Sequence, residues 1–197
     1  MKKRVFISKQ AIIYPLIIIG VIWGVFALQQ IGFFSSCYGI IPWSISGLKG
    51  IVLSPFFHGS FNHLLSNTLP LLILLFLLLQ FYPKQAVKVL VVGWLFSGLG
   101  VWVLPDFNAI QTGVYSCHIG ASGVIYMLAF YLFVSGWLSK KLILLLLSII
   151  VFLLYGGIVY GLLPYQVGNG ISWQGHLMGA ISGVYLAYRL NNKKRKK

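Results

Sequence analysis

The stretch WQGHLMGAISG, residues 173–183, combines a histidine with three glycines in an apolar segment. His176, Gly179 and Gly183 are spaced i, i+3 and i+7, so they share one face of a helix. The small-x-x-x-small pattern of the two glycines lets the backbone of a neighbouring helix approach closely in a membrane. The pattern alone is typical of helix packing. With a histidine at one end of the stripe, it predicts that the imidazole faces the helix that packs there.

The composition around this stretch is that of a membrane protein. Of 197 residues, 59% are hydrophobic and 8% are charged, whereas a typical soluble domain has about 25% charged residues. A helix needs about 20 apolar residues to cross a bilayer. The first apolar run follows a basic start, as in a signal peptide, but it lacks an A-x-A cleavage site and is expected to remain as a helix. The sequence predicts an all-α bundle of six transmembrane helices at 11–28, 61–82, 86–104, 121–138, 142–163 and 173–190.

Positive charges are distributed unevenly between the segments that flank these runs. Fourteen of the fifteen Lys and Arg residues lie in the N-terminal segment, after the second and fourth runs, and at the C-terminal end; the other is Lys49. Because cytoplasmic segments carry the excess of Lys and Arg, both termini are predicted to be cytoplasmic. The net charge of +14 then indicates contact with anionic lipid at the cytoplasmic face and no nucleic-acid partner. The predicted organisation is a basic N-terminus (1–10), a membrane domain (11–190) and a basic cytoplasmic tail (191–197).

The near absence of acidic residues excludes several classes of membrane protein. Asp106 is the single acid, and there is no Glu. An aspartyl intramembrane protease needs two carboxylates, and a zinc protease of the H-E-x-x-H type needs a Glu base. Proton-coupled carriers usually place carboxylates inside the bilayer. The four histidines lack the clustered cysteines or carboxylates of a metal site, so we expect neither a metal nor a cofactor.

Polar residues gather where the second, fourth and sixth runs begin, and with a cytoplasmic N-terminus all three starts lie at the outer face. The clusters are HGSFNHLLSN (58–67), GASG (120–123) and WQGH (173–176), whereas the other three runs contain almost nothing polar. Polar groups at this depth are costly unless they meet one another or water, so the clusters predict one site. A carrier or channel would instead distribute polar groups through the bilayer, and a purely structural span would not need them.

Ser122 and His176 offer a nucleophile and a general base within this site, since a serine needs a base within hydrogen-bond reach. Asp106 lies in an outer loop, so a Ser–His dyad is favoured over a triad. His63 and Asn67, at i and i+4, share a helix face. With the Ser122 backbone N–H at the start of a helix, they can donate hydrogen bonds to an oxyanion. The alternative is that they tie their helix to a loop.

Five other residues near these clusters are interpreted separately. Tyr126 follows the serine by one helical turn, so its ring lies either beneath the imidazole of the dyad or in the core or lipid. His118 either lines a path for water or is structural, and His58 is assigned a structural role. Cys37 and Cys117 lie in outer loops, where oxidation is possible. They form either a disulfide or two unpaired thiols.

Together these residues resemble the rhomboid family of intramembrane serine proteases. The resemblance rests on three motifs in the family's order: H-x-x-x-N at 63–67, G-x-S-G at 120–123 and G-H-x-x-G-x-x-x-G at 175–183. Each motif is weak alone, but together they are specific and extend over essentially the whole chain. The resemblance implies a six-transmembrane-helix rhomboid-like bundle. It also implies a serine endopeptidase that hydrolyses peptide bonds in or near transmembrane segments of membrane-protein substrates. The short loops and the lack of an extra domain suit a bacterial inner membrane.

The resemblance also implies a role for each matching residue. Ser122 is the nucleophile, and His176 is the general base and then the general acid. His63 and Asn67 donate to the oxyanion together with the Ser122 backbone, and Tyr126 packs against the catalytic imidazole. The implied supporting residues are Tyr126, Gly120, Gly179, Gly183 and His58.

One departure from the family concerns the first outer loop. Many rhomboids carry a Trp-Arg pair shortly before the H-x-x-x-N motif, whereas this chain has SGLKGI at 46–51. The loop from Gln29 to Phe57 must therefore be held in another way. The alternative function is a catalytically inactive rhomboid-like protein that binds membrane clients. Such relatives usually lack the serine or the histidine, and both are present here.

Overall fold

The computed structural model describes residues 7–140, 142–154, 162 and 172–191, and over these ranges the chain is helical without a β-strand. Four short elements lie in the connections between the long helices: η1 (Ile45–Gly47), α2 (Gly50–Leu53), η2 (Ser54–Phe56) and α5 (Phe107–Thr112). The long helices are α1 (Lys9–Gln30), α3 (Phe61–Phe81), α4 (Pro83–Val103), α6 (Ser122–Leu138), α7 (Leu142–Leu154) and α8 (Trp173–Asn191). Their starts agree with the predicted runs to within three residues. The end of the fifth predicted run, 155–163, lies outside the described residues except for residue 162.

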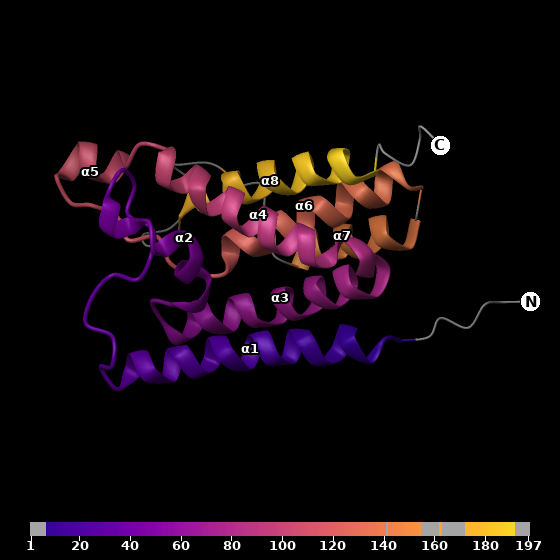
Figure 1. The fold of residues 1–197 in the computed structure, drawn as a ribbon, viewed down its shortest axis with the longest axis horizontal. Helices are drawn as coiled ribbons and strands as arrows, with labels where there is room; N and C mark the ends of the chain where they lie inside the picture. Colours follow the sequence, from indigo (N-terminus) through magenta and orange to yellow (C-terminus); the bar gives the residue numbers. More distant parts are fainter. Residues whose placement is uncertain (1–6, 141, 155–161, 163–171, 192–197) are drawn as a thin grey trace, which may run out of the picture.

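The long helices lie roughly along one direction (Figure 1). α1 packs against α3, and α8 packs against both α6 and α4. The short elements α2 and α5 lie together at one end of the bundle, whereas α1 begins and α8 ends at the opposite end. The residues that begin α3, α6 and α8 are therefore on the side of the short elements.

α6 is the central helix of the described bundle. Its residues Ile125, Met127, Leu128, Tyr131 and Leu132 are all at most 2% exposed. A helix that is apolar on all sides is typical of a buried element. α6 packs against α3, α4, α7 and α8, which explains why the sequence of this helix shows no polar face.

The outer surfaces of α1 and α4 are apolar. Exposed side chains on these two helices include Ile12, Ile13, Leu16, Ile17, Val87, Val91 and Leu95. Helix faces with so many exposed apolar side chains are rare on a soluble monomer, but lipid can cover them. Three described segments are long and apolar enough to cross a membrane: Lys9–Gln30, Phe61–Phe81 and the stretch Pro83–Thr112. Ser122–Leu138 is a shorter apolar helix.

α6 and α8 approach each other through glycines. A Cβ added to Gly179 would collide with the carbonyl oxygen of Gly123, and one added to Gly183 would collide with the carbonyl oxygen of Met127. Both glycines therefore allow backbone-to-backbone contact, as the small-x-x-x-small pattern predicts. This contact determines how closely the starts of α6 and α8 lie at the end of the bundle that carries α2 and α5.

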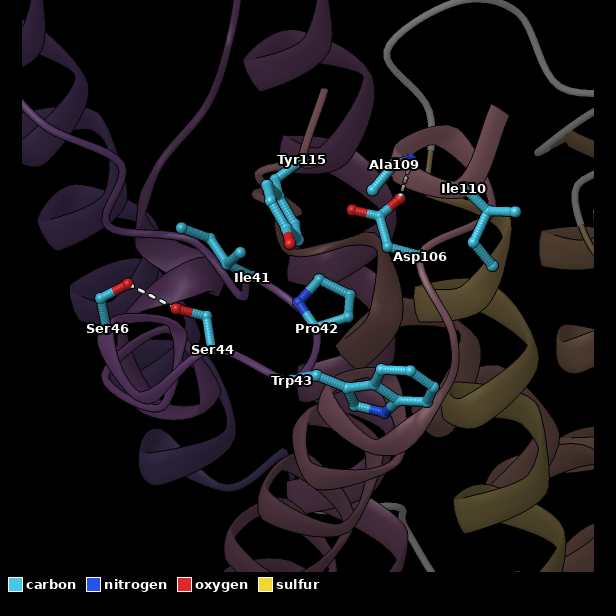
Figure 2. A pocket seen from close by; sticks show the side chains of 9 residues that line it. All are labelled: Ile41, Pro42, Trp43, Ser44, Ser46, Asp106, Ala109, Ile110 and Tyr115. Carbon is cyan, nitrogen blue, oxygen red and sulfur yellow. Dashed lines mark hydrogen bonds between the residues drawn. The ribbon is translucent and has the colours of Figure 1, made fainter. Parts of the chain in front are cut away.

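The first outer loop is held by aromatic side chains and backbone hydrogen bonds. The Trp43 indole donates to the carbonyl of Val103 at 2.8 Å, and the Trp102 indole donates to the carbonyl of Ser44 at 2.9 Å. Tyr38 stacks on Phe57 with ring centroids 4.9 Å apart. The loop is thus tied to α4 without a Trp-Arg pair. Between this loop and α5 lies a pocket of about 630 Å³ lined by Trp43, Tyr115, Asp106 and their neighbours (Figure 2).

Candidate active site

The turn before α6 requires glycine at position 120. Gly120 has a φ of +112°, a conformation that glycine adopts without the steric cost of a Cβ. Its N–H donates to the carbonyl of Ser54 at 2.9 Å. An added Cβ would lie 2.7 Å from both Cε1 and Nε2 of His63 and 3.7 Å from Nδ2 of Asn67. The side chains of the H-x-x-x-N motif therefore converge on the turn that leads into Ser122.

Ser122 is the first residue of α6, so its backbone N–H belongs to the first turn, where N–H groups have no partner within the helix. Helix dipoles also make this end partly positive. Because His63 and Asn67 converge on Gly120, two side-chain donors and this helix start lie around the same turn. The arrangement can hold a small anionic oxygen beside the serine.

His176 lies in the first turn of α8 and is 6% exposed. Its imidazole stacks on the ring of Tyr126, with centroids 4.1 Å apart and planes 5° apart. The start of α8 is stabilised by Ser172, whose hydroxyl accepts from the N–H of Gly175 at 3.0 Å. A Cβ on Gly123 would lie 3.2 Å from the carbonyl oxygen of Gly175. The helix starts that carry Ser122 and His176 are therefore in direct backbone contact.

The hydrogen bonds between described residues do not include one from the Ser122 hydroxyl to the His176 imidazole. Catalytic hydrogen bonds are often long in the absence of substrate and shorten when substrate binds. What the structure brings together is the helix starts, the Tyr126–His176 stack and the convergence of His63 and Asn67 on Gly120.

A small cavity of about 40 Å³ opens beside Ser122. A water molecule needs about 10–15 Å³ of such volume and two to four polar partners, so the cavity is large enough to hold water. Three of the serines that line it, Ser54, Ser97 and Ser172, were not among the site residues predicted from the sequence. Ser97 could have been found from the sequence, because it is a serine beside Gly98 in an otherwise apolar run. The polar side chains that line the cavity are those of Ser54, Ser97, His118, Ser122 and Ser172.

His118 is fixed by its backbone and lines this cavity. It forms an isolated antiparallel bridge with Ile40, with both N–H···O distances 2.9 Å. Burial lowers the pKa of its imidazole below the usual value, and the nearby Asp106 carboxylate offsets part of this shift. The imidazole is therefore neutral at neutral pH, which suits a residue that contacts water without adding charge.

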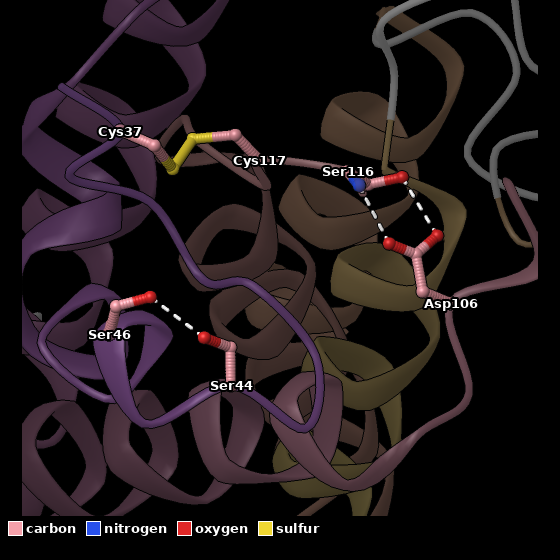
Figure 3. Close-up of a disulfide and its surroundings, with 6 residues drawn as sticks. All are labelled: Cys37, Ser44, Ser46, Asp106, Ser116 and Cys117. Atoms are coloured by element: carbon pink, nitrogen blue, oxygen red, sulfur yellow. Dashed lines mark hydrogen bonds between the residues drawn. A yellow bond between two sulfur atoms is a disulfide. The ribbon is translucent and has the colours of Figure 1, made fainter. Parts of the chain in front are cut away.

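A disulfide joins Cys37 to Cys117, with Cα atoms 6.1 Å apart (Figure 3). It connects the first outer loop to the segment that leads into α6, next to the Ile40–His118 bridge. Of the two interpretations left open by the sequence, the structure therefore has the bonded pair. The disulfide helps to hold the loop in the absence of a Trp-Arg pair.

Asp106 makes hydrogen bonds within its own segment rather than with the dyad. Its carboxylate accepts from the backbone N–H groups of Asn108 and Ala109 at the start of α5, and from both the N–H and hydroxyl of Ser116 (Figure 3). Burial opposes its ionisation, but hydrogen bonds from Ser116 and Ala109 outweigh this effect and hold its pKa below the ordinary value. The carboxylate thus caps α5 and anchors the segment that follows it.

His58 lies 1% exposed beside His63, with ring centroids 5.0 Å apart in an edge-to-face arrangement. Burial, with a smaller contribution from His63, lowers the pKa of His58 to about 4, and the Phe56 carbonyl offsets part of the shift. Neither ring nitrogen has a hydrogen bond of ordinary geometry to a described residue. His58 is thus a neutral ring that packs against His63, a candidate oxyanion donor. This contact gives a more specific account of His58 than a general structural role.

Comparison with known proteins identifies the family. A family model described as "Rhomboid domain" matches residues 43–193, which include all three motifs. Uncharacterized proteins of Mycobacterium tuberculosis and Mycobacterium bovis are 38% identical over 164 residues, covering 80% of this chain and 65% of theirs. An uncharacterized protein of Mycobacterium leprae is 38% identical over 157 residues, covering 76% of this chain and 59% of its own length. The chain thus spans less than two thirds of the length of these curated relatives. Since the family match extends over most of the sequence, the chain belongs to the rhomboid family of integral membrane proteins.

Proposed function

We propose that this protein is an intramembrane serine endopeptidase that hydrolyses peptide bonds in or near transmembrane segments of other membrane proteins. The observation that carries the proposal is the convergence of three helix starts. The His176 imidazole lies on Tyr126, its helix start contacts that of Ser122, and two hydrogen-bond donors meet at Gly120. A nucleophile, a base and an oxyanion site are the parts that acyl transfer needs.

In the proposed reaction, the Ser122 hydroxyl oxygen attacks the scissile carbonyl carbon while His176 takes the hydroxyl proton. The negative oxygen of the tetrahedral intermediate accepts hydrogen bonds from His63, Asn67 and the Ser122 backbone N–H. His176 then gives its proton to the departing amine, the C–N bond breaks, and an acyl-enzyme remains on Ser122. Tyr126 keeps the imidazole plane in place through both transfers.

Water completes the cycle. A water molecule from the cavity beside Ser122 attacks the acyl carbon while His176 accepts its proton. Collapse of the second tetrahedral intermediate breaks the bond to the serine oxygen, which regains its proton, and releases a carboxylic acid. The four serines and His118 around the cavity supply hydrogen bonds that hold water at this depth. A substrate helix must unwind to expose its carbonyl, because its backbone groups are otherwise paired.

The proposed topology is six transmembrane helices over 11–190, with basic cytoplasmic segments at 1–10 and 191–197. α1 and α4 begin, and α6 and α8 end, on the side away from α2 and α5 (Figure 1). Described basic residues at these helix ends include Lys9, Lys84, Lys88, Lys140 and Arg189, whereas Lys49 is in the outer loop. The segregation of these charges favours a topology in which this end faces the cytoplasm and contacts anionic lipid. The active site then lies at the outer face of a bacterial inner membrane.

The test is cleavage of a transmembrane substrate by the purified protein, together with labelling by a fluorophosphonate probe. We expect Ser122→Ala and His176→Ala each to abolish cleavage without lowering the yield of folded protein. Ser46→Ala, which changes an exposed outer serine, should cleave and label normally. EDTA should have no effect. Cleavage that persists in Ser122→Ala would refute the assignment, and a wild-type protein that binds but never cleaves such substrates would favour an inactive client-binding rhomboid.

A further inference from the structure

We propose that Gln29 is a positioning residue for the oxyanion donor His63 and acts through His58. This inference rests on the proposed function, because it concerns how one of the proposed donors is held. Gln29 is in the last turn of α1, and no motif of the sequence includes it. Its contacts nevertheless connect the end of α1 to the active-site turn in three steps.

The first step is a pair of hydrogen bonds between one side chain and one backbone residue. The Gln29 Oε1 atom accepts from the N–H of His58 at 3.1 Å, and its Nε2 atom donates to the carbonyl of His58 at 3.3 Å. His58 precedes α3 and belongs to no helix, so its backbone groups need partners from elsewhere. A primary amide carries both a donor and an acceptor, and so it can satisfy both groups at once.

The second step is the contact between two imidazoles. The His58 ring is 1% exposed and meets His63 edge to face, with centroids 5.0 Å apart. A buried ring whose backbone is fixed on both sides has little freedom to move. It therefore limits where the neighbouring His63 ring can lie.

The third step is the contact between His63 and the turn before the serine. Cε1 and Nε2 of His63 lie so close to Gly120 that a Cβ there would be 2.7 Å from each. His63 is thus placed by two neighbours, the Gly120 turn and the His58 ring. Loss of the Gln29 amide would release the second of these neighbours and let the donor move away from the position of the oxyanion.

The chain offers two matched controls. Gln30 is the adjacent glutamine and is exposed, so Gln30→Leu makes the same chemical change without touching His58. The Trp23 indole donates to the Thr68 hydroxyl at 3.1 Å, a hydrogen bond that also ties α1 to α3 but does not involve His58. Trp23→Phe therefore tests whether weaker packing of α1 on α3 is by itself enough to change catalysis.

The experiment measures both the position of His63 and catalysis. The protein has four histidines, so the ring signals of ¹⁵N-histidine-labelled protein can be assigned by single substitutions. We expect Gln29→Leu to shift the His63 ring signals and to lower kcat by about 3- to 10-fold with KM unchanged, which is less than the loss of a whole donor. Gln30→Leu and Trp23→Phe should do neither. In a His63→Ala background, Gln29→Leu should have no further effect on kcat, because residues that act through one another are not additive.

The possible outcomes separate this inference from the proposed function. Unmoved His63 signals in Gln29→Leu, or an equal loss of kcat with and without His63, would overturn the positioning role. If Gln29→Leu fails to fold, Gln29→Glu retains the acceptor for the His58 N–H, and the same two measurements apply to it. If the wild-type protein does not cleave, the protease proposal fails. The ring signals still show whether Gln29 places His63.

Discussion

The two halves of the candidate active site are held in different ways. Ser122 and His176 lie on helices whose backbones touch through Gly123, Gly175 and Gly179. His63 and Asn67 instead lie at the start of α3, where loops and a turn surround them. The geometry of the first pair depends on the absence of side chains between two helices. The geometry of the second depends on loop segments that are distant in sequence, so the two halves should fail independently.

Among changes that leave Ser122 and His176 in place, replacing a glycine between α6 and α8 by a larger residue should reduce cleavage the most. In Gly179→Ala the new Cβ would collide with the Gly123 carbonyl oxygen, so the helices must separate. Overpacking of this kind typically costs about 1–3 kcal/mol of stability. We expect a lower melting temperature and an almost complete loss of cleavage. Gly24→Ala, where a Cβ would meet nothing within 4 Å, is the matched control, and normal activity in Gly179→Ala would contradict the proposed importance of this contact.

Removing one oxyanion donor should have an intermediate effect that is confined to the transition state. Loss of a single donor in other acyl-transfer sites costs about 100- to 1000-fold in kcat. Because His63 and the Ser122 N–H would share the charge here, we expect Asn67→Ala to lower kcat by about 10- to 100-fold, with little change in KM. Probe labelling of Ser122 should slow but persist. A destabilised Asn67→Ala protein with normal kcat per folded molecule would instead assign this residue to packing.

Removing the disulfide should disturb the half of the site formed by His63 and Asn67 and leave the half formed by Ser122 and His176 intact. The bond closes a loop with a sequence separation of 80 residues, and native disulfides typically contribute about 2–4 kcal/mol to stability. We expect the Cys37→Ala/Cys117→Ala double variant to unfold at lower denaturant concentration and to lose less kcat than Asn67→Ala. The two single variants should match the double variant. A double variant that is more stable than either single variant would show that stray thiol chemistry, and not the bond, causes the effect.

The smallest effect is expected for mild acidification, which should lower the stability of the folded protein through His58. Its folded-state pKa of about 4 lies below the ordinary value of 6.5, so the unfolded protein binds more protons between these values. Stability is therefore fully present above pH 6.5 and falls as the pH decreases toward 4. Each pKa unit corresponds to about 1.4 kcal/mol, which sets a loss of roughly 3 kcal/mol at most. His58→Gln should reduce the fall in melting temperature between pH 7 and 4, whereas an unchanged slope would assign the acid sensitivity to other groups.

The sequence alone determined where the long helices begin and which of their faces matter. Apolar run length indicated the helices, and the i, i+3, i+7 spacing indicated that His176 and the glycines of α8 share a face. That face indeed packs against α6, with Tyr126 beneath the imidazole. These features are local, because periodicity and steric size act within a few residues of each other along one helix.

Only the tertiary structure decided how the loops complete the site. The pairing of Cys37 with Cys117 and the clamp of Gln29 on His58 each join segments that are distant along the chain. The serines from four segments that share the cavity beside Ser122 also come together only in the fold. No periodicity marks such residues, since a loop residue finds its partner through the path of the whole chain. The helices and their faces are therefore determined by local sequence. The placement of the proposed oxyanion donors and the cavity beside Ser122 depend on contacts that exist only once the bundle has formed.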